Sequence, residues 1–442
     1  YPVHRTASEI QGLKAYPSLT AVGERVDLAI VAVPVDACAE AMDQIVSSGA
    51  RAAVVFTSGF AETGEAGARG QRSMAEQARA HGVVLLGPNC LGAMNLHQRM
   101  FATFSPVALG GAPAPGKVAL VSQSGAFGGY AYSLAREAGL GLGHWITTGN
   151  EAGVQVGDAI HWLAGRADCD VILAYMEGTR DEGRLRRALV AARDAGKPVA
   201  IVKVGHSEVG TRAARLHTGS DTGDAARYRI LFDEYGVHQA SSIGELFRVG
   251  YALARGRRPT QWRRNGPLAR NATTPVAVLT ISGGVGIMMA DRAEEHGLRM
   301  PALPDAAAQR LLAAIPFAAT ANPIDVTGQV FSQPEVLVQV LADTARSGCY
   351  GYVAAFLAAA SKAPGVWPLL QECIAGLQCD PDAAPLVMSG ICTAEQRLWL
   401  EANGCLVFEE PAHAIDAVAT LAHAAPHGRG RPSATARVPG LT

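Results

Sequence analysis

Short apolar runs alternate with helical patterns along most of the chain. Residues 26–33 (VDLAIVAV) form a strand-like run and are followed by a helical pattern over residues 36–48. Residues 52–56 (AAVVF) repeat the run, the loop TSGFAETGEAG follows, and a helical pattern over residues 73–81 precedes another run at 83–87. Runs of this length that are separated by helices predict parallel strands covered on both faces. We therefore expect an α/β protein with doubly wound parallel sheets.

The same cycle recurs in two further regions, and loose segments separate them. Residues 105–116 (SPVALGGAPAPG) are rich in Pro and Gly, residues 255–274 are basic and punctuated by Pro, Gly and Asn, and the tail from residue 426 is rich in Pro, Gly and Arg. Such compositions are typical of boundaries, linkers and disordered tails. The predicted organisation is a first domain at 1–110, a second at 111–256, a linker at 257–274, a third domain at 275–425 and a flexible tail at 426–442.

Composition excludes several classes of protein. Of the 442 residues, 49% are hydrophobic and 17% are charged, which fits a set of globular domains and not a largely disordered chain. The formal net charge of −1 provides no global field that would attract nucleic acid or an anionic membrane. No apolar run approaches the roughly 20 residues of a spanning helix. The 8 cysteines show no metal-binding spacing, so we expect reduced thiols, no structural metal and a cytoplasmic location.

A glycine- and hydroxyl-rich loop is expected after the apolar run at residues 198–204, and it contains His217. In open α/β sheets ligands bind at the carboxyl ends of the strands, where this loop would begin. Thr218 offers a hydroxyl donor beside the imidazole, and Gly219 lets a bulky anion approach the backbone. A neutral imidazole can take up a phosphoryl group as a nucleophile. A histidine that only hydrogen-bonds a surface loop is the alternative, and the loop by itself favours it.

Two further candidate sites lie where apolar runs end. The run KVALV leads into SQSGAFGG and a helical pattern, so Ser122, Ser124 and Gly125 would lie at a helix N-terminus, whose free N–H groups bind anions. The sequence is neither a Walker loop nor the GxSxG of a nucleophilic serine. Glu177 ends the run VILAYMEG and could hold the proton of one imidazole nitrogen, leaving the other nitrogen free to attack. A capping or surface glutamate is the alternative.

A proline-containing turn follows the run at residues 83–87. Its sequence is GPNCLGAMN, in which Pro88 and two glycines predict a tight turn that exposes Asn89. An ordinary turn without a ligand is the alternative.

Ten short motifs stand along the chain in the order found in one family of enzymes. They are YPVH, VDLAIVAVP, TSGFAE, GPNCLG, VSQSGA, TTGNEAGV, YMEG, LHTGSDTG, ISGGVGI and NPIDVT. Along nearly its whole length the chain therefore resembles the NDP-forming (ADP-forming) acyl-CoA synthetases of the succinyl-CoA synthetase superfamily, and in particular their alpha subunits. Each motif is weak alone, but their joint order is specific. Leu216, where the family usually has serine, and residues 220–222 depart from the family pattern.

The resemblance implies a fold and a set of site residues. The fold would be a Rossmann-like CoA-binding domain whose first strand and glycine-rich loop would precede Tyr1, followed by two flavodoxin-like domains. His217 would be the phosphorylated histidine and Glu177 its orienting carboxylate. Phosphate would be held by Ser122, Ser124, Gly125, Ala126, Thr218 and Gly219. CoA would contact Val33, Pro34, Thr57, Ser58, Gly59 and Asn89, although without the glycine-rich loop we expect this chain to bind CoA weakly.

The activity implied by the resemblance is that of an acid–CoA ligase. Such an enzyme converts acyl-CoA, phosphate and ADP reversibly into acid, CoA and ATP, through an acyl phosphate and a phosphohistidine. ATP or ADP and Mg²⁺ would be bound by an ATP-grasp domain or subunit, and a homo- or hetero-oligomer is expected, with no nucleic-acid or membrane partner. The alternative is a non-catalytic CoA- or acyl-CoA-binding regulatory module of the same fold. A nicotinamide dehydrogenase is disfavoured because no GxGxxG follows a strand.

Overall fold

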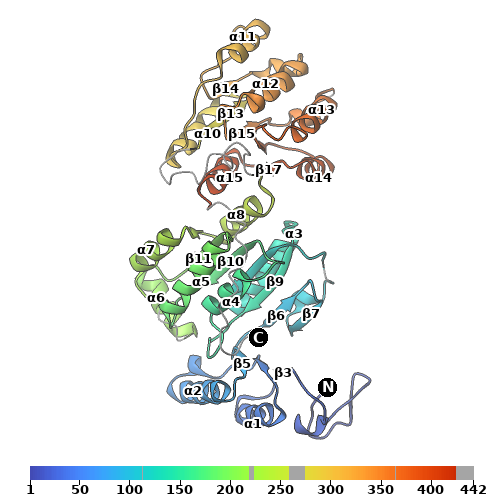
Figure 1. The fold of residues 1–442 in the computed structure, drawn as a ribbon, viewed down its shortest axis with the longest axis vertical. Coiled ribbons are helices and arrows are strands. Elements are labelled where there is room, and N and C mark those ends of the chain that lie inside the picture. Colours follow the sequence, from blue (N-terminus) through green and yellow to red (C-terminus); the bar gives the residue numbers. More distant parts are fainter. Residues whose placement is uncertain (112, 219–222, 258–273, 364, 425–442) are drawn as a thin grey trace. The chain divides into compact units, whose positions relative to one another are not determined.

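A computed structural model describes residues 1–111, 113–218, 223–257, 274–363 and 365–424, without the side chains of residues 214–218. The predicted linker, apart from residues 257 and 274, and the predicted tail lie outside the described residues. The chain forms two compact units, which divide between Gly250 and Tyr251. Parallel sheets flanked by helices make up both units (Figure 1), and the predicted α/β fold class is therefore confirmed.

A small parallel sheet with the order β3-β4-β5 forms the N-terminal region of the first unit. Its strands and helices are β3 (Leu28–Val31), α1 (Cys38–Ser48), β4 (Ala52–Val55), α2 (Glu65–Ala80) and β5 (Val84–Leu86). The smaller elements are β1 (Glu9–Ile10), β2 (Leu13–Lys14), and the 3₁₀ turns η1 (Thr20–Val22), η2 (Val35–Ala37) and η3 (Ala61–Thr63). Met42 and Ile45 of α1 and Met74 of α2 pack with the strands in one apolar core.

A larger sheet with the order β12-β11-β10-β8-β9-β6-β7 forms the rest of the first unit. Its strands are β6 (Gly92–Asn95), β7 (Met100–Thr103), β8 (Val118–Ser122), β9 (Leu142–Thr147), β10 (Val171–Met176), β11 (Val199–Lys203) and β12 (His238–Gln239). Its helices are α3 (Gly125–Glu137), α4 (Val156–Ala164), α5 (Glu182–Asp194), α6 (Glu208–Thr218), α7 (Ala225–Tyr235) and α8 (Ile243–Arg255), with the short η4 (Pro106–Ala108) before β8. The division between the units falls within α8, whose residues from Tyr251 onward belong to the second unit.

Two strands of this sheet come from an unexpected part of the sequence. β6 pairs antiparallel with both β7 and β9, so residues 92–103 extend the second sheet. These residues precede position 110, where we placed the domain boundary. The turn predicted over residues 87–95 is therefore short, because its second half is already strand.

The parallel part of the larger sheet has the flavodoxin-like strand order. Numbered along the chain, β8 to β12 run 2-1-3-4-5 across the sheet, which places the topological switch point between β8 and β10. Helices after β8 and after β10 leave toward opposite faces: α5 packs on the face of Val121 and Ile172, while Gly128 of α3 packs on Ser122, which points to the other face. A crevice for a ligand is expected at such a switch point.

The second unit repeats the same topology. Its parallel sheet has the order β14-β13-β15-β16-β17, again 2-1-3-4-5 along the chain. Its strands are β13 (Val276–Thr280), β14 (Ile324–Asp325), β15 (Tyr352–Phe356), β16 (Leu386–Ser389) and β17 (Leu406–Phe408). Its helices are α10 (Gly283–Glu295), α11 (Asp305–Ala314), α12 (Pro334–Arg346), α13 (Val366–Gln378), α14 (Ala394–Ala402) and α15 (Pro411–His423), with η5 (Gly328–Phe331) and η6 (Ala360–Lys362).

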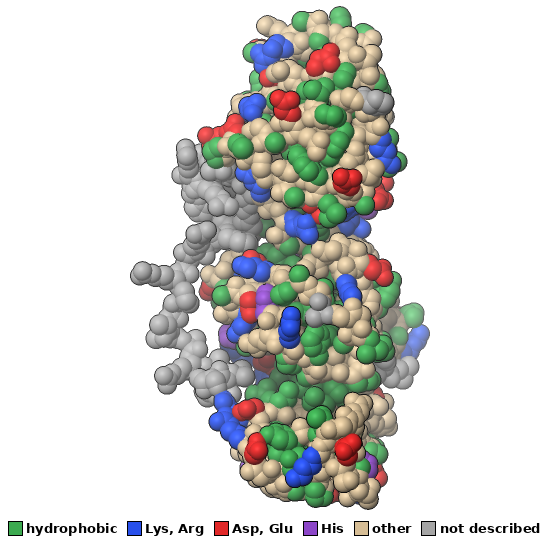
Figure 2. All heavy atoms as spheres, turned by 90° about the vertical axis from the view of Figure 1, so that its right-hand side faces the viewer, with side chains coloured by type: hydrophobic (Ala, Val, Ile, Leu, Met, Phe, Trp, Pro, Cys, Tyr) green, Lys and Arg blue, Asp and Glu red, His purple; other side chains and the backbone are tan. Residues whose placement is uncertain are grey.

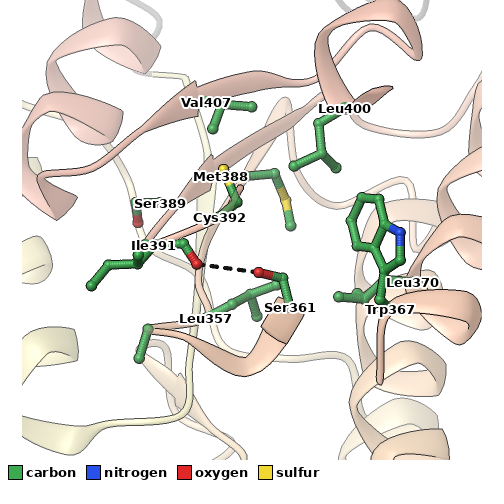
Figure 3. Close-up of a pocket in the computed structure, with 12 residues that line it drawn as sticks. Leu357, Ser361, Trp367, Leu370, Met388, Ser389, Ile391, Cys392, Leu400 and Val407 are labelled. Atoms are coloured by element: carbon green, nitrogen blue, oxygen red, sulfur yellow. Dashed lines mark hydrogen bonds between the residues drawn. The ribbon is translucent and has the colours of Figure 1, made fainter. Parts of the chain in front are cut away.

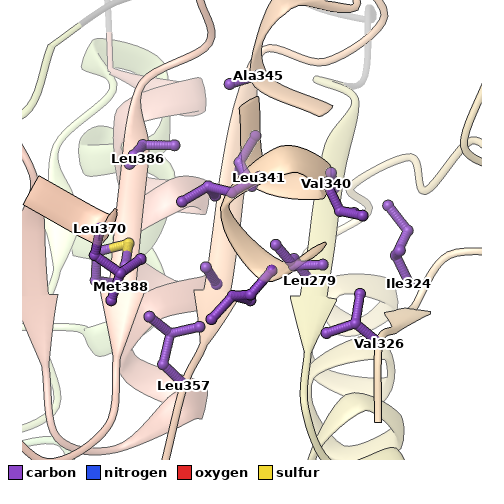
Figure 4. Packing of buried hydrophobic residues seen from close by; sticks show 14 of the residues in the cluster. Leu279, Ile324, Val326, Val340, Leu341, Ala345, Leu357, Leu370, Leu386 and Met388 are labelled. Atoms are coloured by element: carbon purple, nitrogen blue, oxygen red, sulfur yellow. The ribbon is translucent and has the colours of Figure 1, made fainter. Parts of the chain in front are cut away.

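Strand residues of the second unit alternate between two apolar cores. Leu279 and Met388 face α11, α12 and α13, whereas Val278 and Val387 face α10 and α15. Because side chains point to opposite faces with a period of two, a continuous apolar run fills both cores. Figure 4 shows side chains of α12, among them Leu341, meeting those of the strands. The predicted flavodoxin-like architecture of both later regions is confirmed.

One expected loop is helical. The sequence pattern predicted a helix over residues 73–81, but α2 begins at Glu65, inside the segment that we interpreted as loop. A Cβ atom at Gly67 would lie 2.0 Å from the carbonyl oxygen of Phe60, so this glycine allows α2 to pack against the preceding turn. The glycine therefore serves close packing here and does not end the helix.

The described surface carries both signs of charge. On the face drawn in Figure 2, Lys and Arg side chains are interspersed with Asp and Glu side chains. This distribution agrees with the formal net charge of −1. Among the helices that the structure describes, none combines the length and the apolar character needed to cross a membrane.

We predict that Leu341→Ala lowers the free energy of unfolding of the second unit by about 2–5 kcal/mol, because it leaves a cavity in the core. Leu341 is fully buried at 0% exposure, whereas Leu398 on α14 is 67% exposed. The same change at Leu398 should stay within about 0.5 kcal/mol. Urea unfolding of the two variants measures the difference, and equal losses would contradict the packing described here.

Candidate functional site

The carboxyl ends of three neighbouring strands meet at the switch point of the larger sheet. Ser122 ends β8 opposite Tyr175 of β10, and Met176 of β10 lies opposite Lys203 of β11. Glu177 follows directly after β10 and is 2% exposed. The parallel register therefore brings the predicted residues Ser122 and Glu177 to one edge of the sheet, as expected for strand ends.

Helix α3 starts at this edge with a side-chain cap. The hydroxyl of Ser124 accepts the N–H of Phe127 at 3.3 Å, and Ser122 Oγ donates to the carbonyl oxygen of Ser124 at 2.6 Å. Gly125 and Ala126 form the first turn. The remaining N–H groups of that turn and the positive end of the helix dipole form a site suited to an anion. The four predicted phosphate-binding residues of this segment thus surround one helix N-terminus.

Close packing holds α3 against the sheet. A Cβ atom at Gly128 would lie 2.7 Å from Cγ2 of Thr147 and 3.0 Å from Cβ of Ser122. Only a residue without a side chain lets the helix come this near. The distance between the first turn of α3 and the ends of β8 and β9 is therefore set by the Gly128 backbone, which packs directly on the side chains of Ser122 and Thr147.

Two buried side chains that the sequence analysis did not single out lie beside Glu177. Gln123 Oε1 accepts the backbone N–H groups of Glu177 at 2.7 Å and Gly178 at 3.2 Å. Gln123 Nε2 donates to Glu151 Oε2 at 3.1 Å. Both belong to motifs that we quoted, VSQSGA and TTGNEAGV. A polar residue inside such a motif was the available signal, but its partner could not be inferred from the sequence.

Burial dominates the titration of Glu151. Removal from water raises its pKa to about 7, although the N–H of Val156 and the hydroxyl of Thr148 stabilise the ionised form. These two groups donate to Glu151 Oε1 at 2.8 Å and 3.0 Å. Arg180 lowers the pKa and Asp158 raises it through their charges. A carboxyl group with a pKa near neutrality in a buried site is a feature typical of functional regions.

The neighbouring residue, Asn150, connects the site to the first sheet region. Asn150 is 3% exposed and its amide donates to Gln71 Oε1 at 3.0 Å and to Glu62 Oε2. Its own oxygen accepts the amide of Asn89 at 3.2 Å. Asn89, which we expected to be exposed in its turn, is therefore half-buried and bonded across to the turn after β9.

Glu62 of the TSGFAE motif is held ionised by this network. Burial alone would raise its pKa, but hydrogen bonds from the Gly59 N–H and the Asn150 amide lower it below the ordinary value. The Gly59 N–H donates to Glu62 Oε1 at 2.6 Å. The carboxylate thus organises the turn after β4, which lies beside the second region.

The predicted CoA contacts of the first region cluster at one edge of the small sheet. Val33 and Pro34 follow β3, and Thr57, Ser58 and Gly59 follow β4, with Thr57 Oγ1 donating to the Val33 carbonyl at 2.6 Å. β3 and β4 pair in parallel, so both segments leave the same edge. The predicted contacts are brought together, apart from Asn89, which faces Asn150 instead.

Much of the segment that we predicted as the histidine loop is helical. α6 spans Glu208–Thr218, so His217 and Thr218 belong to its last turn and the expected loop is shorter than we predicted. The side chains of His217 and Thr218, and the whole of Gly219, lie outside the described residues. α6 contacts η3, which carries Glu62.

Lys203 is a further residue that the sequence analysis did not single out. It ends β11 with 5% exposure, and its ammonium group lies 4.7 Å from the ring centroid of Tyr228 and donates to the Val204 carbonyl at 2.6 Å. The Tyr228 hydroxyl accepts the N–H of Thr179 at 2.9 Å. A buried cation is thus placed at the edge of the sheet where an anion would bind.

One group of residues has the composition of a metal site. His97, His144 and Asp168 place possible ligand atoms within 4.8 Å of one another. Arg166, however, binds both oxygens of Asp168, at 3.0 Å and 2.8 Å, and lowers the pKa of that carboxyl well below its usual range. The guanidinium group already neutralises the carboxylate, so this arrangement is an ion pair with a buried histidine.

A pocket of the second unit lies at the carboxyl ends of its strands. Figure 3 shows Leu357, Trp367 and Met388 among its walls, with the Ser361 hydroxyl bonded to the Ile391 carbonyl at 3.2 Å. Its lining contains no charged side chain among the described residues. The pocket therefore suits apolar contacts and not a phosphate or diphosphate group.

Two models of protein families match the chain. A CoA binding domain model matches residues 1–95, and a succinyl-CoA ligase like flavodoxin domain model matches residues 115–253. The first range contains the small sheet, and the second contains the parallel strands of the larger sheet and the helix that carries His217.

Characterised relatives cover more of the chain. The alpha subunit of the ADP-forming acetate–CoA ligase II of Pyrococcus furiosus is 32% identical over 421 residues, which are 93% of this chain and 86% of that subunit. The ADP-forming acetate–CoA ligase I of Archaeoglobus fulgidus is 33% identical over 438 residues, or 95% of this chain. The chain spans only 58% of the length of that second relative.

A solved structure shows the same fold. The dinucleotide forming acetyl-coenzyme A synthetase 1 of Ca. Korarchaeum cryptofilum, in complex with phosphate and ADP, matches with a TM-score of 0.80 and 28% identity. The match covers 96% of this chain and 88% of that one. Together with the alpha subunit of Pyrococcus furiosus, this confirms the predicted family: the chain belongs to the NDP-forming acyl-CoA synthetases and is similar to their alpha subunits.

Proposed function

We propose that this chain is the part of an NDP-forming acid–CoA ligase that binds CoA and carries the phosphorylated histidine. The observation that carries the proposal is the position of Glu177, buried beside the N-terminus of α3 at the switch point. The next strand of that sheet leads into the helix of His217. The similarity to the alpha subunit of an ADP-forming acetate–CoA ligase supports the same reaction class.

The reaction proceeds in three displacements. A phosphate oxygen attacks the thioester carbonyl, the C–S bond breaks, and CoA leaves as a thiolate that takes up a proton. An imidazole nitrogen of His217 then attacks the phosphorus of the acyl phosphate, and the P–O bond to the acyl group breaks with release of the carboxylate. Finally an oxygen of ADP attacks the phosphohistidine, the P–N bond breaks, and ATP forms. The same steps in reverse make acyl-CoA from ATP.

Three groups of this chain have distinct roles in these steps. Glu177 holds the proton of the second imidazole nitrogen, so that the attacking nitrogen keeps its lone pair. The first turn of α3, with Ser124, Gly125 and Ala126, stabilises the negative charge of the phosphoryl group by preorganised N–H groups. Thr218, the last residue of α6, and Gly219, which follows it in the sequence, would complete the phosphate contacts.

CoA would bind at the small sheet formed by β3, β4 and β5. The segments after β3 and β4, including Val33, Pro34, Thr57, Ser58 and Gly59, form the edge at which a diphosphate would approach the backbone. The Gly59 backbone has φ of +104°, a conformation that glycine adopts without strain. The match of residues 1–95 to a CoA binding domain supports this placement.

The third step depends on a partner. ADP or ATP with Mg²⁺ would bind to an ATP-grasp domain or subunit, as expected for chains similar to alpha subunits, and the assembly would be an oligomer. All eight cysteines of the chain are free thiols, which fits the reducing conditions of the cytoplasm.

We predict that incubation of the assembled enzyme with acyl-CoA, radioactive phosphate and Mg²⁺ labels His217. Phosphohistidine survives base and is lost in acid, so peptide mapping under alkaline conditions identifies it. His217→Ala should abolish the label, while His206→Ala, an exposed histidine just before the same helix, should retain it. Label that persists in His217→Ala disproves the role, and CoA binding without any label in the wild type favours the regulatory module.

Glu177→Gln should slow phosphorylation of His217 by about 10²- to 10⁴-fold and leave CoA affinity unchanged, since it removes the carboxylate that holds the imidazole proton. Glu182→Gln is the matched control, because that residue pairs with Arg186 and Arg227 at the start of α5. Rapid-quench labelling and calorimetry measure the two effects. Equal phosphorylation rates in wild type and Glu177→Gln would identify Glu177 as a structural residue only.

A further inference from the structure

The Gln123 amide forms a hydrogen-bonded bridge between Glu151 and the backbone at Glu177 and Gly178. This amide has a fixed orientation in the bridge. Both oxygens of Glu151 already accept hydrogen bonds: Oε1 from Thr148 and Val156, and Oε2 from Gln123. Above its pKa of about 7 the Glu151 carboxyl group is mostly ionised and has no hydrogen to donate, so the NH₂ end of the Gln123 amide faces it. The oxygen end of Gln123 must then face the N–H groups of Glu177 and Gly178, as observed.

Rotation of the Gln123 amide would break the arrangement at both ends. Its NH₂ group would then meet the two backbone N–H groups, and its oxygen would meet the oxygen of Glu151. Gln123 is 4% exposed and Glu151 is 3% exposed, so water has little access to relieve such contacts. Unsatisfied donors in a buried site are costly, and the loop at Glu177 would have to move.

We propose that Glu151, acting through Gln123, is a positioning residue that fixes the backbone at Glu177 for phosphoryl transfer. The inference rests on the function proposed above, since it concerns the same site. Glu151 touches no reacting group; it determines which end of the Gln123 amide receives the N–H groups after β10. The carboxylate of Glu177 is then held where the imidazole must meet it, and a shift of about 1 Å at such a position costs up to about 100-fold in rate.

Glu151→Gln tests the direction of the bridge with almost no change of shape. The new amide has one oxygen and one NH₂ group. If its NH₂ faces Val156, two donors meet there; if it faces Gln123, the Gln123 amide must rotate and donors meet at Glu177. Two groups, Thr148 and Val156, donate at the first position and only Gln123 donates at the second, so we expect the amide oxygen at the first position and the NH₂ group toward Gln123. Rotation of Gln123 then brings its own NH₂ group onto the N–H groups of Glu177 and Gly178.

Exchange of the two side-chain types restores every hydrogen bond. In the double variant Glu151→Gln with Gln123→Glu, the new carboxylate at 123 accepts the N–H groups of Glu177 and Gly178 and the NH₂ group from position 151. The amide oxygen at 151 accepts from Thr148 and Val156. Asp158→Asn is the control, because it removes a charge that acts on Glu151 without touching Gln123.

The direct measurement is hydrogen–deuterium exchange of the peptide that contains residues 177 and 178. It is made at pH 8, above the pKa of about 7 of Glu151, where the carboxylate is mostly ionised. We expect exchange at these amides to be at least tenfold faster in Glu151→Gln than in wild type. The double variant should return to within about threefold of wild type, and Asp158→Asn should be unchanged.

A second measurement connects the bridge to chemistry. The rate of His217 phosphorylation should fall tenfold or more in Glu151→Gln, with unchanged affinity for CoA, and should recover in the double variant. Wild-type exchange rates in Glu151→Gln, or a double variant that exchanges no more slowly than the single one, overturn the inference. If the single variant does not fold, the folding and protection of the double variant decide. The exchange data hold even if the wild type is never phosphorylated, so failure of the proposed function is recognised separately.

Discussion

The turn after β9 is the constraint on which the first unit depends, because two of its neighbouring side chains bind different regions. Asn150 donates to Glu62 of η3, in the region of the small sheet, and Glu151 accepts from Gln123, which follows β8 of the larger sheet. Gly149 makes this possible: it has φ of +60°, and a Cβ atom there would lie 2.3 Å from the Pro88 carbonyl oxygen. Backbone contact therefore fixes the turn. The buried amide of Asn150 then binds Glu62 in one region, and the buried carboxylate of Glu151 binds Gln123 in the other.

The order of the strands brings the candidate site residues of the larger sheet together at its switch point. In the order 2-1-3-4-5 the helices after the first and third strands leave toward opposite faces, so a crevice is expected between the loops that begin at Ser122 and Glu177. One loop supplies a helix N-terminus and the other a carboxylate. An anion and an imidazole could meet there, since the positive end of the dipole and a proton acceptor are needed together.

The second unit has the same strand order but a different character at its strand ends. Its pocket there is apolar, and alternating residues of β13, β15, β16 and β17 fill its two cores. The shared topology thus does not imply a shared function, because chemistry lies in the residues of the loops and not in the sheet. This contrast is the reason that the proposed histidine chemistry is assigned to the first unit alone.

The sequence by itself determined the α/β class, the ends of the strands and the motifs at those ends, because apolar periodicity and Gly-rich turns act over a few residues. It placed Ser122, Ser124 and Glu177 at strand ends, and the register of β8 and β10 brings these ends together. It did not identify Gln123 and Glu151, nor the addition of β6 and β7 to the larger sheet. Those features depend on which strands become neighbours and on which buried polar groups must find partners, and only the tertiary structure decides both.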